Sequence, residues 1–66
     1  MQVRINGIET AVPDGTTIHD LVETRQLTPE AVVVEHNQAI VRREAWKTIP
    51  LAEHDALEFL SFVGGG

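Results

Sequence analysis

The chain has 66 residues, of which 42% are hydrophobic and 23% charged, and its formal net charge is −5. So short a chain forms a single domain without room for a walled catalytic cleft, and the absence of cysteine excludes disulfides and thiolate chemistry. The acidic balance argues against nucleic acid as a partner, because a phosphate backbone attracts basic proteins.

The first element expected is a β-hairpin over residues 2–13. Apolar and polar residues alternate with a period of two on both sides of Asn6-Gly7. This dipeptide is the strongest short hairpin signal, because both residues tolerate positive φ. Pro13-Asp14-Gly15 then ends the pattern.

A short helix is expected next. Thr17 is a suitable N-cap, and Asp20 can return a hydrogen bond as a weaker form of the capping box. Arg25 is expected in the last turn, where a cation favours the helix dipole, and the helix should end before Pro29. The residues that share its apolar face are Ile18, Leu21 and Val22.

The second half of the chain reads mainly as strands. Residues 42–46 are irregular or form one short helical turn, and turns are expected at 36–38 and 53–55. Pro50 weakens one strand candidate and restricts it to a sheet edge. The strand candidates are residues 31–35, 39–41, 47–51 and 57–63. One helix that must cover a sheet predicts a two-layer α+β fold.

Alternation divides the last strand into two faces. If Leu57 and Phe59 face the helix, Leu60 and Phe62 face outward. We expect Leu60, Phe62 and Glu58 to form a docking site, with Glu58 meeting a basic rim on the partner. The alternative is a different register, in which these apolar residues belong to the core.

Few other residues suggest chemistry. His19, His36 and His54 share no metal-ligand spacing, so they are expected to be ordinary surface residues, and no metal site is predicted. Trp46 is expected to be a packing anchor.

We expect a cytoplasmic protein without a membrane partner. No apolar run approaches the roughly 18 residues that a membrane helix needs. The polar start Met1-Gln2-Val3-Arg4 lacks the regions of a signal peptide, and a chain without cysteine fits a reducing compartment.

The sequence closes with Gly64, Gly65 and Gly66. Glycines without side chains to pack predict a flexible tail, and the Gly66 carboxylate is ionised at neutral pH. Such a carboxylate must first be activated, most simply as an acyl-adenylate made from ATP. The chain has no phosphate-cradling glycine-rich loop, so the activating enzyme must be separate and no cofactor is expected to bind here. The alternative is an inert, frayed end.

These features together resemble the β-grasp, ubiquitin-like sulfur carriers, and most closely the ThiS family of thiamine biosynthesis. The segments that carry the resemblance are Asn6-Gly7, residues 14–18, residues 34–37, residues 41–46 and residues 62–66. The resemblance implies a mixed sheet of four to five strands packed on one helix, in a domain over residues 1–63 with a tail over 64–66. One departure concerns the turn at His54-Asp55, where the family usually has Gly-Asp.

The resemblance also implies a function. A ThiF-like enzyme would adenylate Gly66, sulfur from cysteine would arrive through a desulfurase, and thiazole synthase would receive it from the thiocarboxylate. Gly64 and Gly65 would give the tail slim access to these partners. The protein would be a cosubstrate, not an enzyme. Alternatives are a sulfur carrier for molybdopterin synthesis, a ubiquitin-like modifier joined to lysine, and a plain interaction domain.

Overall fold

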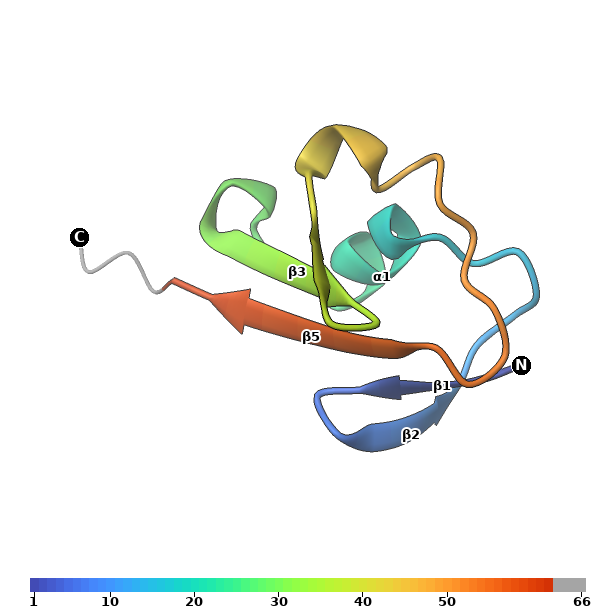
Figure 1. Cartoon of the computed structure of the whole chain (residues 1–66). Helices are drawn as coiled ribbons and strands as arrows, with labels where there is room; N and C mark the ends of the chain where they lie inside the picture. Colours follow the sequence, from blue (N-terminus) through green and yellow to red (C-terminus); the bar gives the residue numbers. More distant parts are fainter. Residues whose placement is uncertain (63–66) are drawn as a thin grey trace.

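The computed structural model describes residues 1–62, which form one sheet with one α-helix and two short 3-10 helices (Figure 1). The strands are β1 (Gln2–Ile5), β2 (Ile8–Ala11), β3 (Val32–His36), β4 (Ala39–Val41) and β5 (Ala56–Ser61). The helices are α1 (Ile18–Thr24), η1 (Pro29–Ala31) and η2 (Arg43–Ala45). The predicted α+β class is confirmed.

The sheet has the order β2-β1-β5-β3-β4. β5 pairs parallel with β1 and antiparallel with β3, and the two outer pairs are antiparallel, so the sheet is mixed and its last strand is central. α1 packs on one face of this sheet (Figure 1). This is the β-grasp arrangement that the resemblance implied.

Both hairpins close through two residues with positive φ. The first has Asn6 at 50° and Gly7 at 84°, which confirms the prediction from this dipeptide. The second has Asn37 at 51° and Gln38 at 74°. Positive φ at both central positions is the signature of type I′ turns, whose twist matches that of paired strands. Gln38 adopts this conformation at a cost that glycine would avoid.

The predicted capping box of α1 is present. The Asp20 amide donates to Thr17 Oγ1 at 3.2 Å, and the Thr17 amide donates to Asp20 Oδ2 at 3.0 Å. The predicted place of Arg25 in the last turn is wrong, because α1 ends at Thr24 and Arg25 is its C-cap. Within residues 1–62, no helix is long and apolar enough to cross a membrane.

One hydrophobic core joins the helix to the sheet. Trp46, 3% exposed, is the predicted packing anchor, and its indole N–H donates to the Val41 carbonyl oxygen at 3.2 Å. The buried apolar residues are Val3, Ile5, Val12, Ile18, Leu21, Val22, Val32, Val34, Trp46, Leu51, Leu57 and Phe59. They include all three residues expected on the helix face.

The predicted strand over residues 47–51 is wrong. This segment makes only an isolated bridge between Pro50 and Thr17, and the Leu51 amide donates to the Thr16 carbonyl oxygen at 2.9 Å. Proline has no N–H to donate, so a continuous ladder cannot form there. The predicted strand boundaries also shift, since Ala31 belongs to η1 and β5 begins one residue earlier, at Ala56.

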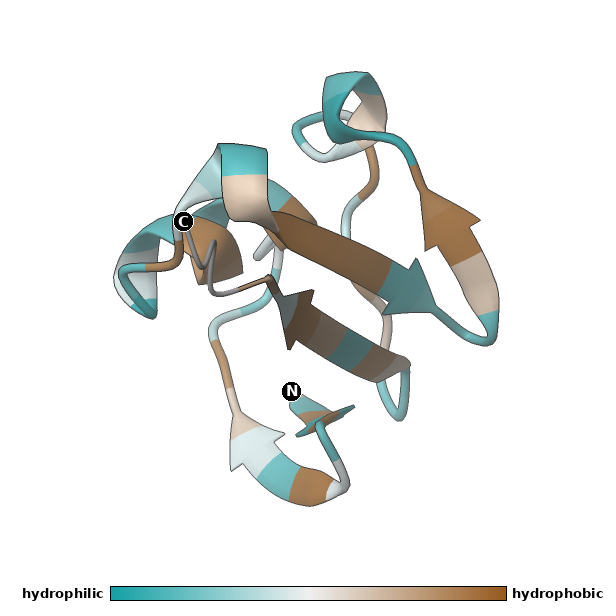
Figure 2. Cartoon of the chain, turned by 90° about the vertical axis from the view of Figure 1, so that its left-hand side faces the viewer, coloured by the Kyte–Doolittle hydropathy of each residue, from teal (hydrophilic) through white to brown (hydrophobic). Residues whose placement is uncertain are grey.

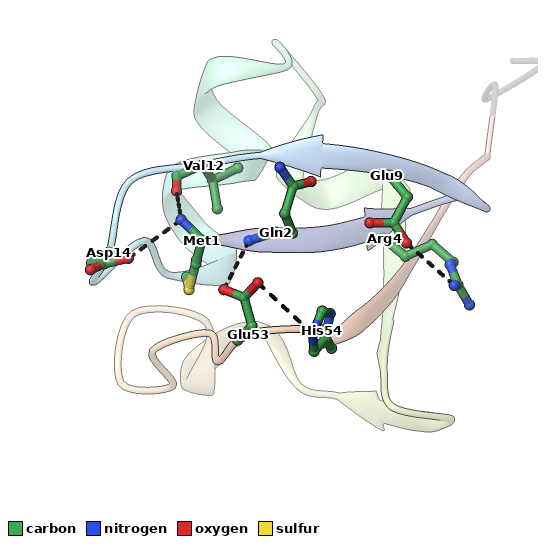
Figure 3. A network of polar contacts seen from close by, with 8 residues as sticks. All are labelled: Met1, Gln2, Arg4, Glu9, Val12, Asp14, Glu53 and His54. Atoms are coloured by element: carbon green, nitrogen blue, oxygen red, sulfur yellow. Dashed lines mark hydrogen bonds and ion pairs between the residues drawn. The ribbon is translucent and has the colours of Figure 1, made fainter.

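Polar contacts hold the first residues of the sheet in place (Figure 3). The Met1 ammonium donates to the Val12 carbonyl oxygen at 2.8 Å. The Gln2 amide donates to Glu53 Oε1 at 3.1 Å, and the Gln2 carbonyl oxygen accepts from the His54 amide at 2.7 Å. The turn that precedes β5 is therefore fastened to β1.

Candidate functional site: the two ends of β5

β5 leads to the predicted tail, and its side chains alternate as expected. Leu57 is fully buried and Phe59 is 7% exposed, whereas Leu60 is 51% and Phe62 60% exposed. Glu58 is exposed as well. The predicted division of faces is confirmed, and the alternative that Leu60 and Phe62 belong to the core is wrong. Docking at these three residues stays a prediction.

The neighbours of β5 change along its length. The Asn6 amide donates to the Leu57 carbonyl oxygen at 2.9 Å, and next the Phe59 amide donates to the Asn6 side-chain oxygen at 2.8 Å. Asn6 thus ends the pairing with β1. On the other side, pairing with β3 continues, and the Phe62 amide donates to the Ala31 carbonyl oxygen at 2.7 Å. β3, together with the Ala31 carbonyl group of η1, therefore supports the chain up to the last described residue.

The predicted tail, Gly64, Gly65 and Gly66, lies outside the described residues, as does Val63. The roles predicted for these glycines therefore stay predictions. The part of the chain that the structure describes supplies the strand from which they continue.

The opposite end of β5 holds a polar cluster that the sequence did not reveal. His36 Nε2–H donates to Asp55 Oδ2 at 2.7 Å, and Asn37 Nδ2–H donates to Asp55 Oδ1 at 3.1 Å. The Ala52 amide donates to Asp55 Oδ2 at 2.9 Å, and the Ala56 amide donates to Asn37 Oδ1 at 2.9 Å. We call His36, Asn37 and Asp55 the β5 clasp, since they join the β3–β4 turn to the start of β5.

The prediction of a simple surface role for His36 is wrong. Its side chain is 19% exposed and that of Asp55 is 13% exposed. Burial alone would raise the pKa of Asp55, but the hydrogen bonds from His36, the Ala52 amide and Asn37, together with the charge of His36, lower it overall. In the sequence, only short polar residues in both turns pointed to the clasp. Its partners are 18 or 19 residues apart, so no local pattern could predict their contact.

Of the other two histidines, His54 lies at the surface as expected, whereas His19 is half-buried. His19 Nε2 is 3.3 Å from Glu23 Oε2 on the next turn of α1. His54, whose side chain is 78% exposed, adopts φ 70°, a conformation that favours glycine. At the position where the family usually has glycine, His54 thus adopts a left-handed conformation that glycine would adopt without strain. Residues 1–62 contain no group of three His, Cys, Asp or Glu side chains placed to hold a metal ion.

Comparison with known proteins gives one consistent result. The model of the ThiS family matches residues 3–66. A sulfur carrier protein ThiS from Bacillus subtilis is 40% identical over 53 residues, which are 80% of each chain. A thiazole synthase from Magnetococcus marinus is 36% identical over all 66 residues, although the chain spans only 20% of that relative's length.

Solved structures agree with the sequence matches. The crystal structure of a thiamine biosynthesis protein (ThiS) from Geobacter metallireducens superimposes with a TM-score of 0.84 at 32% identity, and covers 100% of both chains. An NMR structure of a thiamine biosynthesis protein from the same organism gives a TM-score of 0.80 at 32% identity, and the match covers 100% of this chain and 88% of the other.

Proposed function

Because the chain belongs to the ThiS family, we propose that it is a sulfur carrier of thiamine biosynthesis that holds its sulfur on the carboxylate of Gly66. It acts as a protein cosubstrate and not as an enzyme. The observation that carries the proposal is the family match over residues 3–66, because the matched range includes the three glycines.

The chemistry begins with activation of the carboxylate. A carboxylate at neutral pH repels nucleophiles and offers a poor leaving group. A ThiF-like enzyme uses ATP to form the acyl-adenylate: a Gly66 oxygen bonds to the α-phosphorus and pyrophosphate leaves. The terminal sulfur of the persulfide that a desulfurase forms from cysteine then attacks the carbonyl carbon and displaces AMP, and a thiol cleaves the S–S bond of the resulting acyl disulfide, which releases the thiocarboxylate and leaves a disulfide. Thiazole synthase takes the sulfur from the resulting thiocarboxylate.

Two features of the described residues support this role. β5 is fixed on the β3 side up to Phe62, so the residues that follow start from a defined position. Leu60 and Phe62 expose apolar surface beside this position, as a transient partner contact requires. Gly64 and Gly65 lack Cβ atoms, so an enzyme channel around them can be narrow.

The acceptor is thiazole synthase in this proposal. A relative that carries this name includes a segment similar to the whole of this chain. A segment similar to this chain within a polypeptide named for the synthase supports a functional link between the carrier and the synthase.

The proposal is tested by loading. The purified protein is incubated with a ThiF-like enzyme, ATP, cysteine and a desulfurase, and is then weighed intact. We expect a mass gain that corresponds to the exchange of one oxygen for sulfur. Higher-mass conjugates would identify a ubiquitin-like modifier instead. Transfer to thiazole synthase, but not to molybdopterin synthase, distinguishes the two carrier roles.

Two variants locate the sulfur. Deletion of Gly65 and Gly66, or addition of one residue after Gly66, should abolish loading and leave the unfolding midpoint unchanged. Normal loading of either variant would show that Gly66 is not the acyl carrier. The matched control adds one residue before Met1, which should leave loading intact.

A further inference from the structure

The register of the sheet places two carboxylates directly opposite each other. Glu35 of β3 pairs with Glu58 of β5. The flanking bonds from the Asn37 amide to the Ala56 carbonyl oxygen and from the Phe62 amide to the Ala31 carbonyl oxygen identify this as a hydrogen-bonded pair, with Cα atoms about 5.5 Å apart. Both side chains lie on the sheet face opposite α1, because their neighbours along each strand point inward.

No internal cation neutralises this pair within residues 1–62. The ion pairs and side-chain hydrogen bonds of this part of the chain involve neither Glu35 nor Glu58. Arg4 lies on the same face opposite Ala56, but its guanidinium is directed to Glu9, with 3.4 Å between Nη2 and Oε2. Like charges directly opposite each other destabilise a sheet.

Apolar side chains surround the carboxylates. Ile40 of β4 lies opposite Glu35, and the next pair along β3 and β5 is Val33 with Leu60. Ile40 is 69% exposed. Figure 2 shows that most residues of β3 and β5 are apolar. The acidic–apolar face is defined by Val33, Glu35, Ile40, Glu58, Leu60 and Phe62.

We propose that the acidic–apolar face binds a basic face of the adenylating enzyme, which inserts an arginine guanidinium between Glu35 and Glu58. This inference rests on the proposed function, since a carrier must dock on the enzyme that activates it. A guanidinium presents a planar fork of donors that two carboxylates can accept together, which the single ammonium of lysine does not match. Its carbon chain lies along Leu60 and Ile40, which exclude water from the charges.

The face also provides specificity. The repulsion between the two carboxylates is present in the free carrier and is relieved only when a cation arrives between them. A surface with an apolar centre but no basic group would bury both charges unpaired, which is strongly unfavourable. The net charge of −5 adds long-range attraction to a basic partner.

The test measures binding without chemistry. Isothermal titration with the ThiF-like adenylating enzyme, in the absence of ATP and sulfur, compares wild type with Glu35→Gln, Glu58→Gln and the double variant. We expect each single variant to bind about tenfold more weakly, with losses that are not additive because both carboxylates hold one cation. Added salt should weaken wild type more than the double variant.

A matched control distinguishes the effect of the Glu35–Glu58 pair on binding from the effect of removing any exposed negative charge. Glu44→Gln makes the same substitution at an exposed residue of η2, on the α1 side of the sheet, and should bind within about twofold of wild type (Figure 1). The double variant should unfold at the same or a higher urea concentration, since it loses a repulsion and no internal bond. A merely structural role would lower that concentration instead.

The inference is overturned if the double variant binds as tightly as wild type, or if Glu44→Gln weakens binding as much as Glu35→Gln does. Either result leaves the proposed function intact, provided that wild type gains sulfur in the loading assay. Failure of wild type to gain sulfur overturns the proposed function, whatever the titrations show.

Discussion

At the start of β5, Asp55 accepts hydrogen bonds from His36, Asn37 and the Ala52 amide, whereas at its end Leu60 and Phe62 expose more than half of their surface. The first region satisfies its polar groups within the chain. The second exposes apolar side chains beside two carboxylates that have no partner cation within residues 1–62. A single strand thus joins a part built for stability to a part built for contact, and substitutions at the two should have different consequences.

The largest difference is expected between two leucines of the same strand. Leu57→Ala should lower the free energy of unfolding by about 3 kcal/mol, because it removes a fully buried side chain from the core. A chain of this length has only about 3–10 kcal/mol in total. Leu60→Ala, at 51% exposure, should cost less than about 0.5 kcal/mol. Urea unfolding followed by circular dichroism measures both, and equal losses would contradict the division of faces.

A substitution in the β5 clasp should have the next largest effect on the free energy of unfolding. Asp55→Asn should cost about 2 kcal/mol, because an amide cannot accept from all three donors and one of them is left unpaired. The matched substitution on the acidic–apolar face, Glu58→Gln, should not measurably lower the free energy of unfolding. If the two variants unfold at the same urea concentration, the clasp does not stabilise the fold.

The sequence predicts the local elements of this comparison well. Asn6-Gly7 and Thr17 are signals that depend on a few adjacent residues, and both features are present. The alternation from Leu57 to Phe62 is local as well, and it separates the two faces correctly. These features are determined by backbone geometry that neighbouring residues alone can favour.

Contacts between residues far apart in the chain could not be predicted from the sequence. The clasp joins residues 18 and 19 positions apart, and Glu35 meets Glu58 only through the register of β3 and β5. The strand over residues 47–51 fails for a more local reason, since Pro50 has no N–H to donate and the apolar residues beside it pack on the core without forming a ladder. Local preference cannot report which distant segment will accept a hydrogen bond.

Acid should destabilise the β5 clasp. The pKa of Asp55 is lowered in the folded chain, so its contribution to stability is fully present above the unfolded pKa of about 3.9 and is lost as the pH falls from there through the folded pKa. As the pH falls below about 3.9, wild type should therefore lose more stability than Asp55→Asn. Urea midpoints at several pH values test this, and parallel curves for the two proteins would contradict it.

The smallest expected effect is a gain beside the clasp. His54 adopts φ 70°, and its exposed ring has one ion-pair partner within residues 1–62, Glu53 at 3.9 Å (Figure 3). His54→Gly removes a left-handed strain of about 1–2 kcal/mol but adds freedom to the unfolded chain, so the net gain should be about 0.5 kcal/mol. His54→Ala is the control, since it removes the ring but keeps the Cβ, and it should gain nothing. If His54→Ala gained as much stability as His54→Gly, the gain would come from removal of the ring. The backbone at this turn would then carry no left-handed strain.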